Sequence, residues 1–338
     1  GRWIAAGVSA LDARTTSRAL ALGTAGERRE VRHAPDVGLA AWNSCAGSQP
    51  WGQPADQRGD DVRTLHVDHL MGAATAVIGA PVARLRVRPE ADRAAVAVRL
   101  CAVGPDGTSV LVSRGLLNLS YRDGLTGEAP LTPTPVEPGR WYDVEVELET
   151  CAYEWAAGET LRLSIGVTEW PNAVAPPVPQ GISVDLGVST LSLPVVDTTG
   201  IDEPELPAAP PEEAGSSDDD ASSDDDSHVR WWSERDVLAR TTRAHVDHGA
   251  RYAAPYDARC AEHYLGTVEV RDDDWAQRAT ASTTFEVSWP QVSAVAVSTL
   301  DLVADALAYD VTLTLRVTED GEPLHERRWH ERIPRDLG

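Results

Sequence analysis

The sequence predicts an all-β protein, a β-sandwich followed by a second antiparallel β module. Apolar and β-branched residues alternate with polar ones along many short segments, which is the period-2 pattern of strands with one buried face. Turn-forming residues recur between these segments, as at Gly79-Ala80-Pro81 and Glu137-Pro138-Gly139. No stretch of helical length carries an apolar stripe with a 3.6-residue period. Many short strands separated by turns are typical of sandwich folds.

The clearest predicted element is a hairpin within residues 94–123. Val96 and Val98 lie at alternate positions of the first strand, and the same pattern resumes at Val110 in the second. Between the strands, Gly104-Pro105-Asp106-Gly107 provides a proline that presets φ and a glycine that accepts positive φ, so we expect a short antiparallel connection. Because parts of both strands are apolar at nearly every position, we expect the hairpin in the middle of a sheet rather than at an edge.

Further strands are expected on both sides of an acidic segment. In the first part of the chain we predict them at residues 18–22, 62–70, 77–88, 142–151, 161–170, 182–186 and 191–196. In the second part we predict an antiparallel meander with strands at residues 237–246, 262–270, 279–289, 292–303, 307–317 and 324–333. Ala281, Thr283 and Phe285 occupy alternate positions of one of them, so these three side chains should share a face.

Composition divides the chain into three expected parts. Residues 1–196 form the sandwich, residues 197–227 an acidic Pro/Ser/Asp linker, and residues 228–338 the second β module. The linker contains twelve acidic residues and no basic one, and such a segment cannot bury enough apolar surface to pack. Its aspartate triplets lack the D-x-D-x-D-G spacing and the distal Glu of an EF-hand loop, so no calcium site is predicted there.

The charge of the chain excludes several classes of partner. It has 53 acidic and 30 basic residues, a net charge of −23, which argues against binding nucleic acid or an anionic membrane. No apolar run approaches the roughly 18 residues that span a bilayer. The four cysteines lie far apart, and none forms a C-x-x-C pair. We therefore predict no nucleic-acid partner, no membrane partner and no cofactor.

A repeated histidine motif invites a metal interpretation. His66-Val67-Asp68-His69 recurs as His245-Val246-Asp247-His248. Residues i and i+3 of a strand point to opposite faces, so neither motif offers two imidazoles to one ion. We predict no metal site from these motifs.

Several ordered sequence runs resemble one known family. They are ADQRGDD, IGAPVARLRV, VRLCAVGPDGTSVLVSRGLLNLSYRD and WYDVEVELETCAYEWAAGETLRLSIGVTEWP. Together they resemble the C-terminal sandwich of the X-Pro dipeptidyl-peptidase and cocaine-esterase-like (CocE/NonD) serine hydrolases, over residues 1–196. The resemblance implies a jelly-roll (galactose-binding-like) accessory domain in a bacterial, cytoplasmic protein. It also implies an α/β-hydrolase domain upstream of Gly1 that carries the chemistry.

The catalytic motif of that family is missing from this chain. No G-x-S-x-G occurs, and the nearest runs, residues 7–11 and 181–185, lack the final glycine. We therefore expect no Ser-His-Asp triad here, although the parent protein should be a serine hydrolase, either a dipeptidyl-peptidase or an esterase. The resemblance implies that this chain covers and shapes the substrate cleft of the hydrolase domain, through which an acyl ester or peptide is bound. The alternative is a stand-alone jelly-roll binding module of the carbohydrate-binding type, whose exposed tryptophans stack on sugars.

Two neighbouring groups of residues are candidate sites. The first lies in a loop rich in Gly, Ser and Pro, where binding residues often gather, and Trp offers a large contact area with one polar group. Its residues are candidates for the substrate cleft or for a domain interface: Trp42, Asn43, Ser44 and Trp51. The second places carboxylates beside a guanidinium: Asp56, Arg58, Asp60 and Asp61. A structural Arg58–Asp bridge that fixes the entry to the sandwich, or its contact with the hydrolase domain, is favoured over a paired-carboxylate active site.

Overall fold

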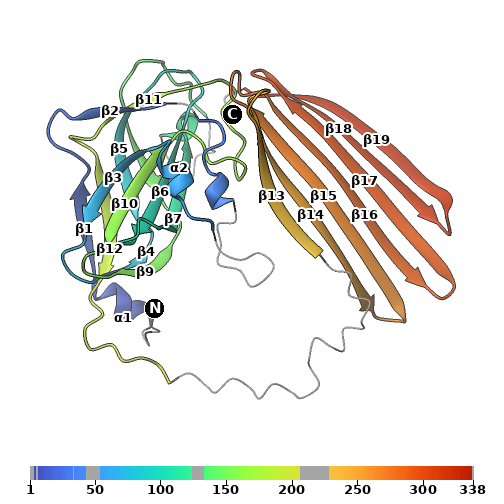
Figure 1. The fold of residues 1–338 in the computed structure, drawn as a ribbon, viewed down its shortest axis with the longest axis horizontal. Helices are drawn as coiled ribbons and strands as arrows, with labels where there is room; N and C mark the ends of the chain where they lie inside the picture. Colours follow the sequence, from blue (N-terminus) through green and yellow to red (C-terminus); the bar gives the residue numbers. More distant parts are fainter. Residues whose placement is uncertain are drawn as a thin grey trace. The chain divides into compact units, whose positions relative to one another are not determined.

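The computed structural model describes residues 4, 7–32, 34–42, 54–123, 133–205 and 228–336. Its contacts divide the chain into two compact units, Gly1–Glu205 with Leu337–Gly338, and Leu206–Asp336. Residues 206–227 of the expected linker lie outside the described residues, as do Asn43, Ser44 and Trp51. Both units are built from antiparallel strands (Figure 1), so the predicted all-β fold class is confirmed.

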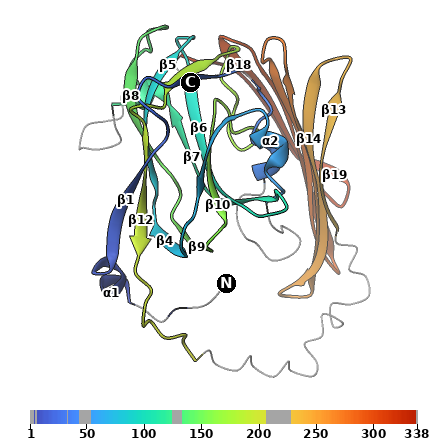
Figure 2. The ribbon, with the colours of Figure 1, turned by 60° about the vertical axis from the view of Figure 1, so that its left-hand side comes forward.

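The first unit contains two antiparallel sheets that form two layers (Figure 2). The larger sheet contains β1 (Thr15–Ala21), β2 (Arg28–Val31), β4 (Thr75–Gly79), β5 (Val82–Pro89), β8 (Tyr142–Glu147), β9 (Cys151–Trp155), β11 (Ile182–Asp185) and β12 (Thr190–Val196). Its order is β2-β11-β5-β12-β4-β9, with β1 paired to β12 and β8 to β5. The smaller sheet has the order β3 (Leu65–Leu70), β10 (Thr160–Gly166), β6 (Ala95–Val103) and β7 (Ser109–Asn118).

Helical structure in the described residues is short. It comprises α1 (Val8–Asp12), η1 (Leu39–Ala41), α2 (Arg58–Asp61) and η2 (Leu119–Tyr121). No helix in these ranges is long and apolar enough to cross a lipid bilayer.

The core of the first unit lies between its two sheets. Val98 and Leu100 of β6 and Leu163 of β10 point to the same side of the smaller sheet, and all three are 0% exposed. Val87 and Leu191 of the larger sheet are equally buried. Full burial of an aliphatic side chain contributes about 1.5–3 kcal/mol. The period-2 pattern in the sequence therefore reflects the face of each strand that enters this core.

The predicted hairpin consists of β6 and β7, which pair antiparallel. Gly107 has φ +82°, and its N–H donates to the Gly104 carbonyl at 3.0 Å, which closes the predicted turn. The prediction of a central position is wrong for β7, because β7 is the edge strand of the described sheet, with Val110 49% and Leu116 45% exposed. β6 is buried on both faces because α2 and η1 cover its outer side. The nearly continuous apolar sequence of β6 therefore reflects burial under α2 and η1 on its outer face. It does not reflect an additional strand beside β7.

Some predicted strand boundaries also need correction. The strand expected at residues 77–88 is two strands, β4 and β5, separated where Gly79 takes φ +130°. The strand expected from residue 237 starts four residues later, at Thr241, and β13 (His228–Asp236) precedes it. Val237 and Leu238 are exposed turn residues, because the Asp236 carboxylate accepts hydrogen bonds from the N–H groups of Leu238 and Ala239. The sequence therefore predicted the start of a strand at two apolar residues that form a tight turn.

The second unit is one seven-stranded antiparallel sheet in which each strand pairs with the next (Figure 1, gold to red). Besides β13 it contains β14 (Thr241–Ala254), β15 (Ala258–Arg271), β16 (Gln277–Trp289), β17 (Val292–Ala304), β18 (Ala308–Glu319) and β19 (Glu322–Pro334). This order is the predicted meander.

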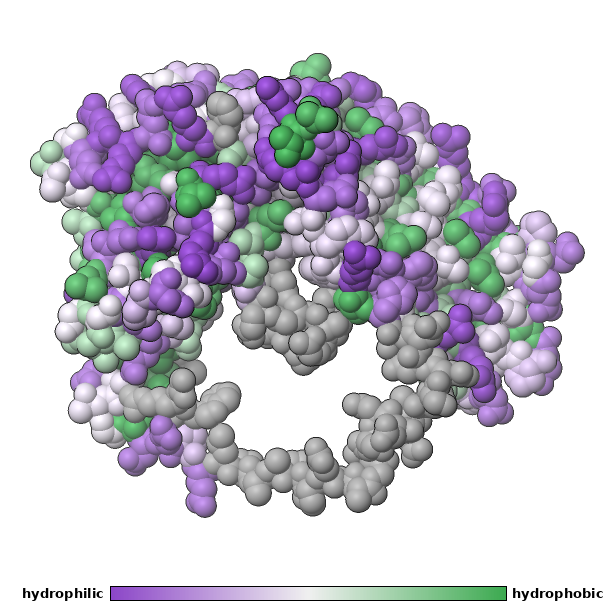
Figure 3. All heavy atoms as spheres, viewed as in Figure 1, coloured by the Kyte–Doolittle hydropathy of each residue, from purple (hydrophilic) through white to green (hydrophobic). Residues whose placement is uncertain are grey.

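The two faces of this sheet differ in polarity. Phe285 of β16 lies opposite Ala296 of β17, which lies opposite Val317 of β18, so this face is mainly apolar at its centre. The other face carries polar residues at the corresponding positions, such as Thr284 of β16 directly opposite His263 of β15. Hydrophobic atoms are interspersed with hydrophilic ones on the visible face of these strands (Figure 3).

Candidate domain-interface site

Arginine side chains occupy the outer face of the smaller sheet. Because Val98 and Leu100 face the core, the intervening Arg99 of β6 must point outward, and it lies directly opposite Arg114 of β7. Arg99 is nevertheless only 1% exposed. A buried guanidinium needs carboxylate partners to offset its desolvation. Those partners come from segments distant in the sequence.

Asp60 of α2 is the central carboxylate over this face. Its Oδ2 accepts hydrogen bonds from Arg99 Nη1 at 3.2 Å and from the backbone N–H groups of Gly38 at 2.9 Å and Ala40 at 3.2 Å. Its Oδ1 accepts from Arg63 Nη2 at 3.2 Å. Asp60 is 2% exposed, so one buried side chain joins the smaller sheet, α2 and the N-terminal end of η1.

Two further carboxylates balance the remaining guanidinium groups. Asp36 Oδ1 accepts from Arg63 Nη1 at 2.6 Å. Glu169 accepts from Arg99 Nη1 at 3.5 Å and from Arg114 Nη1 at 3.3 Å. Burial raises the pKa of Glu169, and the two guanidinium groups oppose that shift. We call this set the charged cluster; it pairs three carboxyl groups with three guanidinium groups: Asp36, Asp60, Glu169, Arg63, Arg99 and Arg114.

Asp61 belongs to a separate network. Its Oδ1 accepts from Ser164 Oγ and its Oδ2 from Ser109 Oγ, both at 2.8 Å, and Oδ2 also accepts from Arg162 Nη1 at 3.0 Å. Arg162 in turn holds both oxygens of Asp68 at 2.8 Å. The hydrogen bond from Arg162 lowers the pKa of the Asp68 carboxyl below its usual value. Since Asp60 and Asp61 contact different partners, the described geometry is that of structural ion pairs.

Asp56 and Arg58 form a more exposed pair. Arg58 Nη2 lies 2.6 Å from Asp56 Oδ2, with side chains 57% and 31% exposed. Asp56 Oδ1 also accepts from the backbone N–H of Ser109 at 3.1 Å, which connects α2 to the start of β7. An Arg58–Asp bridge is thus present, while its predicted role at a contact with another domain stays a prediction.

Trp42 lies directly after a firmly held segment. The Ala41 carbonyl accepts hydrogen bonds from Arg114 Nη1 at 3.3 Å and from Asn172 Nδ2 at 2.9 Å. Trp42 itself is half-buried. A pocket of about 390 Å³ opens beside these groups, and its lining includes Arg114, Leu116, Glu149, Glu169 and Asn172. The charged cluster therefore positions the start of the predicted interface loop next to this pocket.

Sequence reasoning missed most of this cluster. Asp36, Arg99, Arg114 and Glu169 were not among the candidate residues, because their partners lie 27 to 73 residues away in the chain. One signal was available, since Arg99 interrupts the apolar run Ala94–Val103, and a lone charge in a buried strand requires a partner.

Comparison with known proteins shows the family. Residues 13–202 match the X-Pro dipeptidyl-peptidase C-terminal non-catalytic domain. Among curated relatives, the Xaa-Pro dipeptidyl-peptidase of Streptococcus gordonii is 33% identical over 84 residues, which is 25% of this chain and 10% of the relative. That of Streptococcus sanguinis is 30% identical over 86 residues, 25% and 11% of the two chains. The match thus spans about a tenth of the length of these relatives.

Solved structures give weaker similarities. An aminopeptidase from a marine sediment Thaumarchaeota archaeon aligns with TM-score 0.46 and 16% identity, covering 55% of this chain and 37% of the other. A CocE/NonD family hydrolase from Staphylococcus aureus aligns with TM-score 0.40 and 13% identity, covering 54% and 37%. The resemblance inferred from the sequence is confirmed by the family match over more than half of the chain. This chain belongs to the X-Pro dipeptidyl-peptidase C-terminal non-catalytic domain family.

Proposed function

We propose that this chain is the non-catalytic C-terminal part of a CocE/NonD-type α/β-hydrolase, an X-Pro dipeptidyl-peptidase or acyl esterase. In this proposal it covers and shapes the substrate cleft of a hydrolase domain in the same polypeptide. The observation that carries the proposal is the family match over residues 13–202. An acyl ester or peptide would be bound through the hydrolase domain, and a cytoplasmic location remains part of the proposal.

The geometry around Trp42 supports a contact at this position. Ala41 is held by Arg114 and Asn172, and Gly38 and Ala40 are held by Asp60, so the chain reaches Trp42 from a rigid support. Preorganised backbone lowers the entropy cost of forming an interface. Trp is among the residues that contribute most at the centre of interfaces.

The carbohydrate-binding alternative finds less support in the described part of the sandwich. Sugar stacking needs an exposed aromatic face. Trp155 is 0% and Trp170 2% exposed. The ring of Trp141 is occupied by guanidinium groups, with Arg28 5.1 Å and Arg88 5.2 Å from its centroid.

The test compares the longer enzyme with the 338-residue chain. Trp42→Ala in the enzyme should lower kcat/KM or change substrate preference, since loss of a buried interface Trp costs about 2 kcal/mol or more, roughly 30-fold. The same change in the 338-residue chain should leave its Tm nearly unchanged. Trp141→Ala is the matched control, because its ring is covered by this chain's own arginines, and it should spare kcat/KM. Unchanged kinetics together with a marked loss of chain stability would assign Trp42 to the sandwich core and contradict the proposal.

A further inference from the structure

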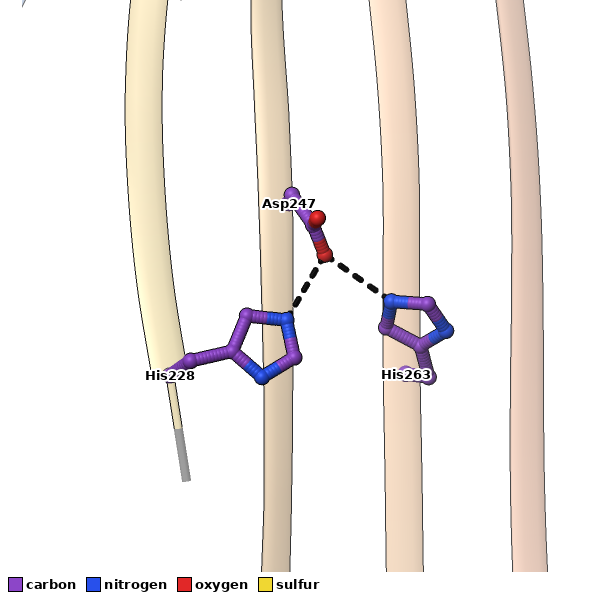
Figure 4. A group of neighbouring side chains, drawn as sticks. All are labelled: His228, Asp247 and His263. Atoms are coloured by element: carbon purple, nitrogen blue, oxygen red, sulfur yellow. Dashed lines mark hydrogen bonds and ion pairs between the residues drawn. The ribbon is translucent and has the colours of Figure 1, made fainter. Parts of the chain in front are cut away.

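Three side chains from three adjacent strands of the second unit converge on one point (Figure 4). His228 is the first residue of β13, Asp247 lies on β14 and His263 on β15. Asp247 Oδ1 lies 2.8 Å from His228 Nε2 and 2.9 Å from His263 Nε2. Across the described ranges, this is the one group of at least three His, Cys, Asp or Glu residues whose ligand atoms all lie within 4.8 Å of one another.

Strand register explains why the two imidazoles meet. His228 and His263 both lie directly opposite Gly249 of β14, one on each side of it, so all three positions share a face. Asp247 is two residues before Gly249 and therefore shares that face as well. A Cβ on Gly249 would lie 2.6 Å from Cε1 of His228. The glycine thus leaves the space that the His228 ring occupies.

The donor set suits a borderline divalent metal ion. Imidazole nitrogen and carboxylate oxygen bind Zn²⁺ at about 2.0–2.2 Å, which places ligand atoms of one ion about 3–4 Å apart. Small side-chain rotations reach that spacing from the observed separations, which are below 4.8 Å. The side chains of His228, Asp247 and His263 are 49%, 29% and 45% exposed, so water can complete the coordination. An adjoining pocket of about 340 Å³ includes both histidines in its lining.

We propose that His228, Asp247 and His263 form a binding site for a divalent transition-metal ion of the Zn²⁺ class, with water in the remaining coordination position. The ion would link the first residue of the edge strand β13 to β14 and β15, the next two strands of the sheet. This inference is independent of the function proposed for the first unit, because it rests on other residues.

The repeated histidine motif could not predict this site, because its two histidines have other partners. Within that motif, His245 bonds Thr267 Oγ1 at 2.9 Å and stacks on Trp232. His248 stacks on Tyr264. Only Asp247 of the motif belongs to the site, and its partners come from β13 and β15, which no sequence spacing connects.

The test is isothermal titration of Zn²⁺ into the full 338-residue chain after removal of metal by a chelator. The chain should bind one ion at this site. His228→Gln and Asp247→Asn each remove one proposed ligand. Each should weaken zinc binding by at least about 10–100-fold, the loss that follows when only a hydrogen-bond partner of a ligand is changed. Gly249→Ala removes no ligand but displaces the His228 ring, so zinc binding should weaken by about tenfold.

The matched control is His330→Gln. His330 is an exposed imidazole of the same sheet, 3.7 Å from Asp310, but it lacks a third ligand. Zinc affinity should stay at the wild-type value in this variant. Any zinc bound by other side chains contributes equally to both variants, so the difference between them reports the proposed site alone. Far-UV circular dichroism checks that each variant is folded, and His228→Gln, at the end of the edge strand, carries the test if Asp247→Asn unfolds. Absence of zinc binding by the wild-type chain, or equal affinity in His228→Gln and His330→Gln, would show that the group is a hydrogen-bonded cluster only and overturn the proposal.

Discussion

Arg99 shows how one buried charge organises its surroundings. Arg99 lies between apolar residues in the sequence, but its guanidinium pairs with the carboxylates of Asp60 from α2 and Glu169 from the segment after β10. Pairing does not make such a charge strongly stabilising, because desolvation offsets most of the attraction. Removal of one partner is different, since it leaves the other charge buried and unpaired.

Asp60→Asn should therefore destabilise the first unit markedly. We expect a loss of about 3–5 kcal/mol in the free energy of unfolding, the usual cost of breaking a buried ion pair. Asp56→Asn, in the exposed pair with Arg58, should cost less than about 1 kcal/mol. Urea unfolding of both variants measures the two values. Equal losses would mean that removing the Asp60 carboxylate does not leave Arg99 as an unpaired buried charge.

Cys101 should be chemically inert in the folded chain. Its thiol is 0% exposed, and burial raises its pKa to about 12. The thiolate is the reactive form, so its population near neutral pH is very small. Iodoacetamide at pH 8 should leave Cys101 unmodified in the native chain and modify it in urea, as read by peptide mass spectrometry. Modification of native Cys101 at the rate seen in urea would contradict its burial.

The Asp68–Arg162 pair predicts a pH dependence. The hydrogen bond from Arg162 lowers the pKa of Asp68 from its usual value of 3.8. A carboxyl group with a lowered folded pKa stabilises above its unfolded pKa, and this stability is lost as pH falls through the folded pKa. The Tm of the unmodified chain should therefore decrease as the pH falls below about 4. The Tm of Asp68→Asn should decrease less steeply over the same pH range. Identical pH profiles for the two proteins would exclude this pair as a contributor.

Among the elements, Gly38 sets how closely the segment before η1 approaches the segment that follows β10. It has φ +116°, and a Cβ there would lie 2.6 Å from the Glu169 carbonyl carbon. The N–H of Trp170 donates to the Val37 carbonyl at 3.0 Å in the same contact. This approach places Gly38 and Ala40 within reach of Asp60.

Gly38→Ala should accordingly cost more than a glycine substitution in an open turn. Gly107 has φ +82° with no atom within 4 Å of an added Cβ, so Gly107→Ala should cost only conformational strain, about 1–2 kcal/mol. Gly38→Ala adds an overlap with backbone, typically about 1–3 kcal/mol more. Thermal unfolding of the two variants provides the comparison, and a smaller loss for Gly38→Ala than for Gly107→Ala would refute the close contact.

The elements also show what could be predicted from sequence. Strands such as β8 and β16 were anticipated because residues of different polarity alternate along them, and in β8 the apolar residues are the buried ones. β13 was missed because polar and charged residues surround its tryptophans, and most of its residues are exposed. The site residues Asp60 and Asp61 were identified through their charges, but their partners Arg99 and Ser164 were not. Long-range pairing is set by sheet register, which a single sequence does not encode locally.

At the scale of the whole molecule, the two units have separate internal contacts. The first buries a core between two sheets, whereas the second is a single sheet whose residues are mostly half-buried or exposed. The proposed organisation, with a sandwich at 1–196, an acidic linker at 197–227 and a β module at 228–338, follows from composition. The sequence predicted the second module as an antiparallel meander of six strands, and the structure adds β13 as a seventh strand at its edge.

The proposed division can be examined with two fragments. A fragment of residues 1–205 should fold alone, with a cooperative thermal transition and the near-UV circular dichroism of buried Trp155 and Trp170, because its core lies within those residues. Failure of this fragment to show a cooperative transition would mean that the first unit needs the second for its stability.

Serine-directed labelling distinguishes an accessory domain from a domain with its own nucleophile. We propose that this chain is the non-catalytic part of a serine hydrolase whose nucleophile lies in another domain. A fluorophosphonate probe reacts only with an activated serine. We expect no heat-sensitive labelling of the purified 338-residue chain and strong labelling of the proposed longer enzyme that contains it. Heat-sensitive labelling of the 338-residue chain itself would show an activated serine in this chain and contradict the proposal.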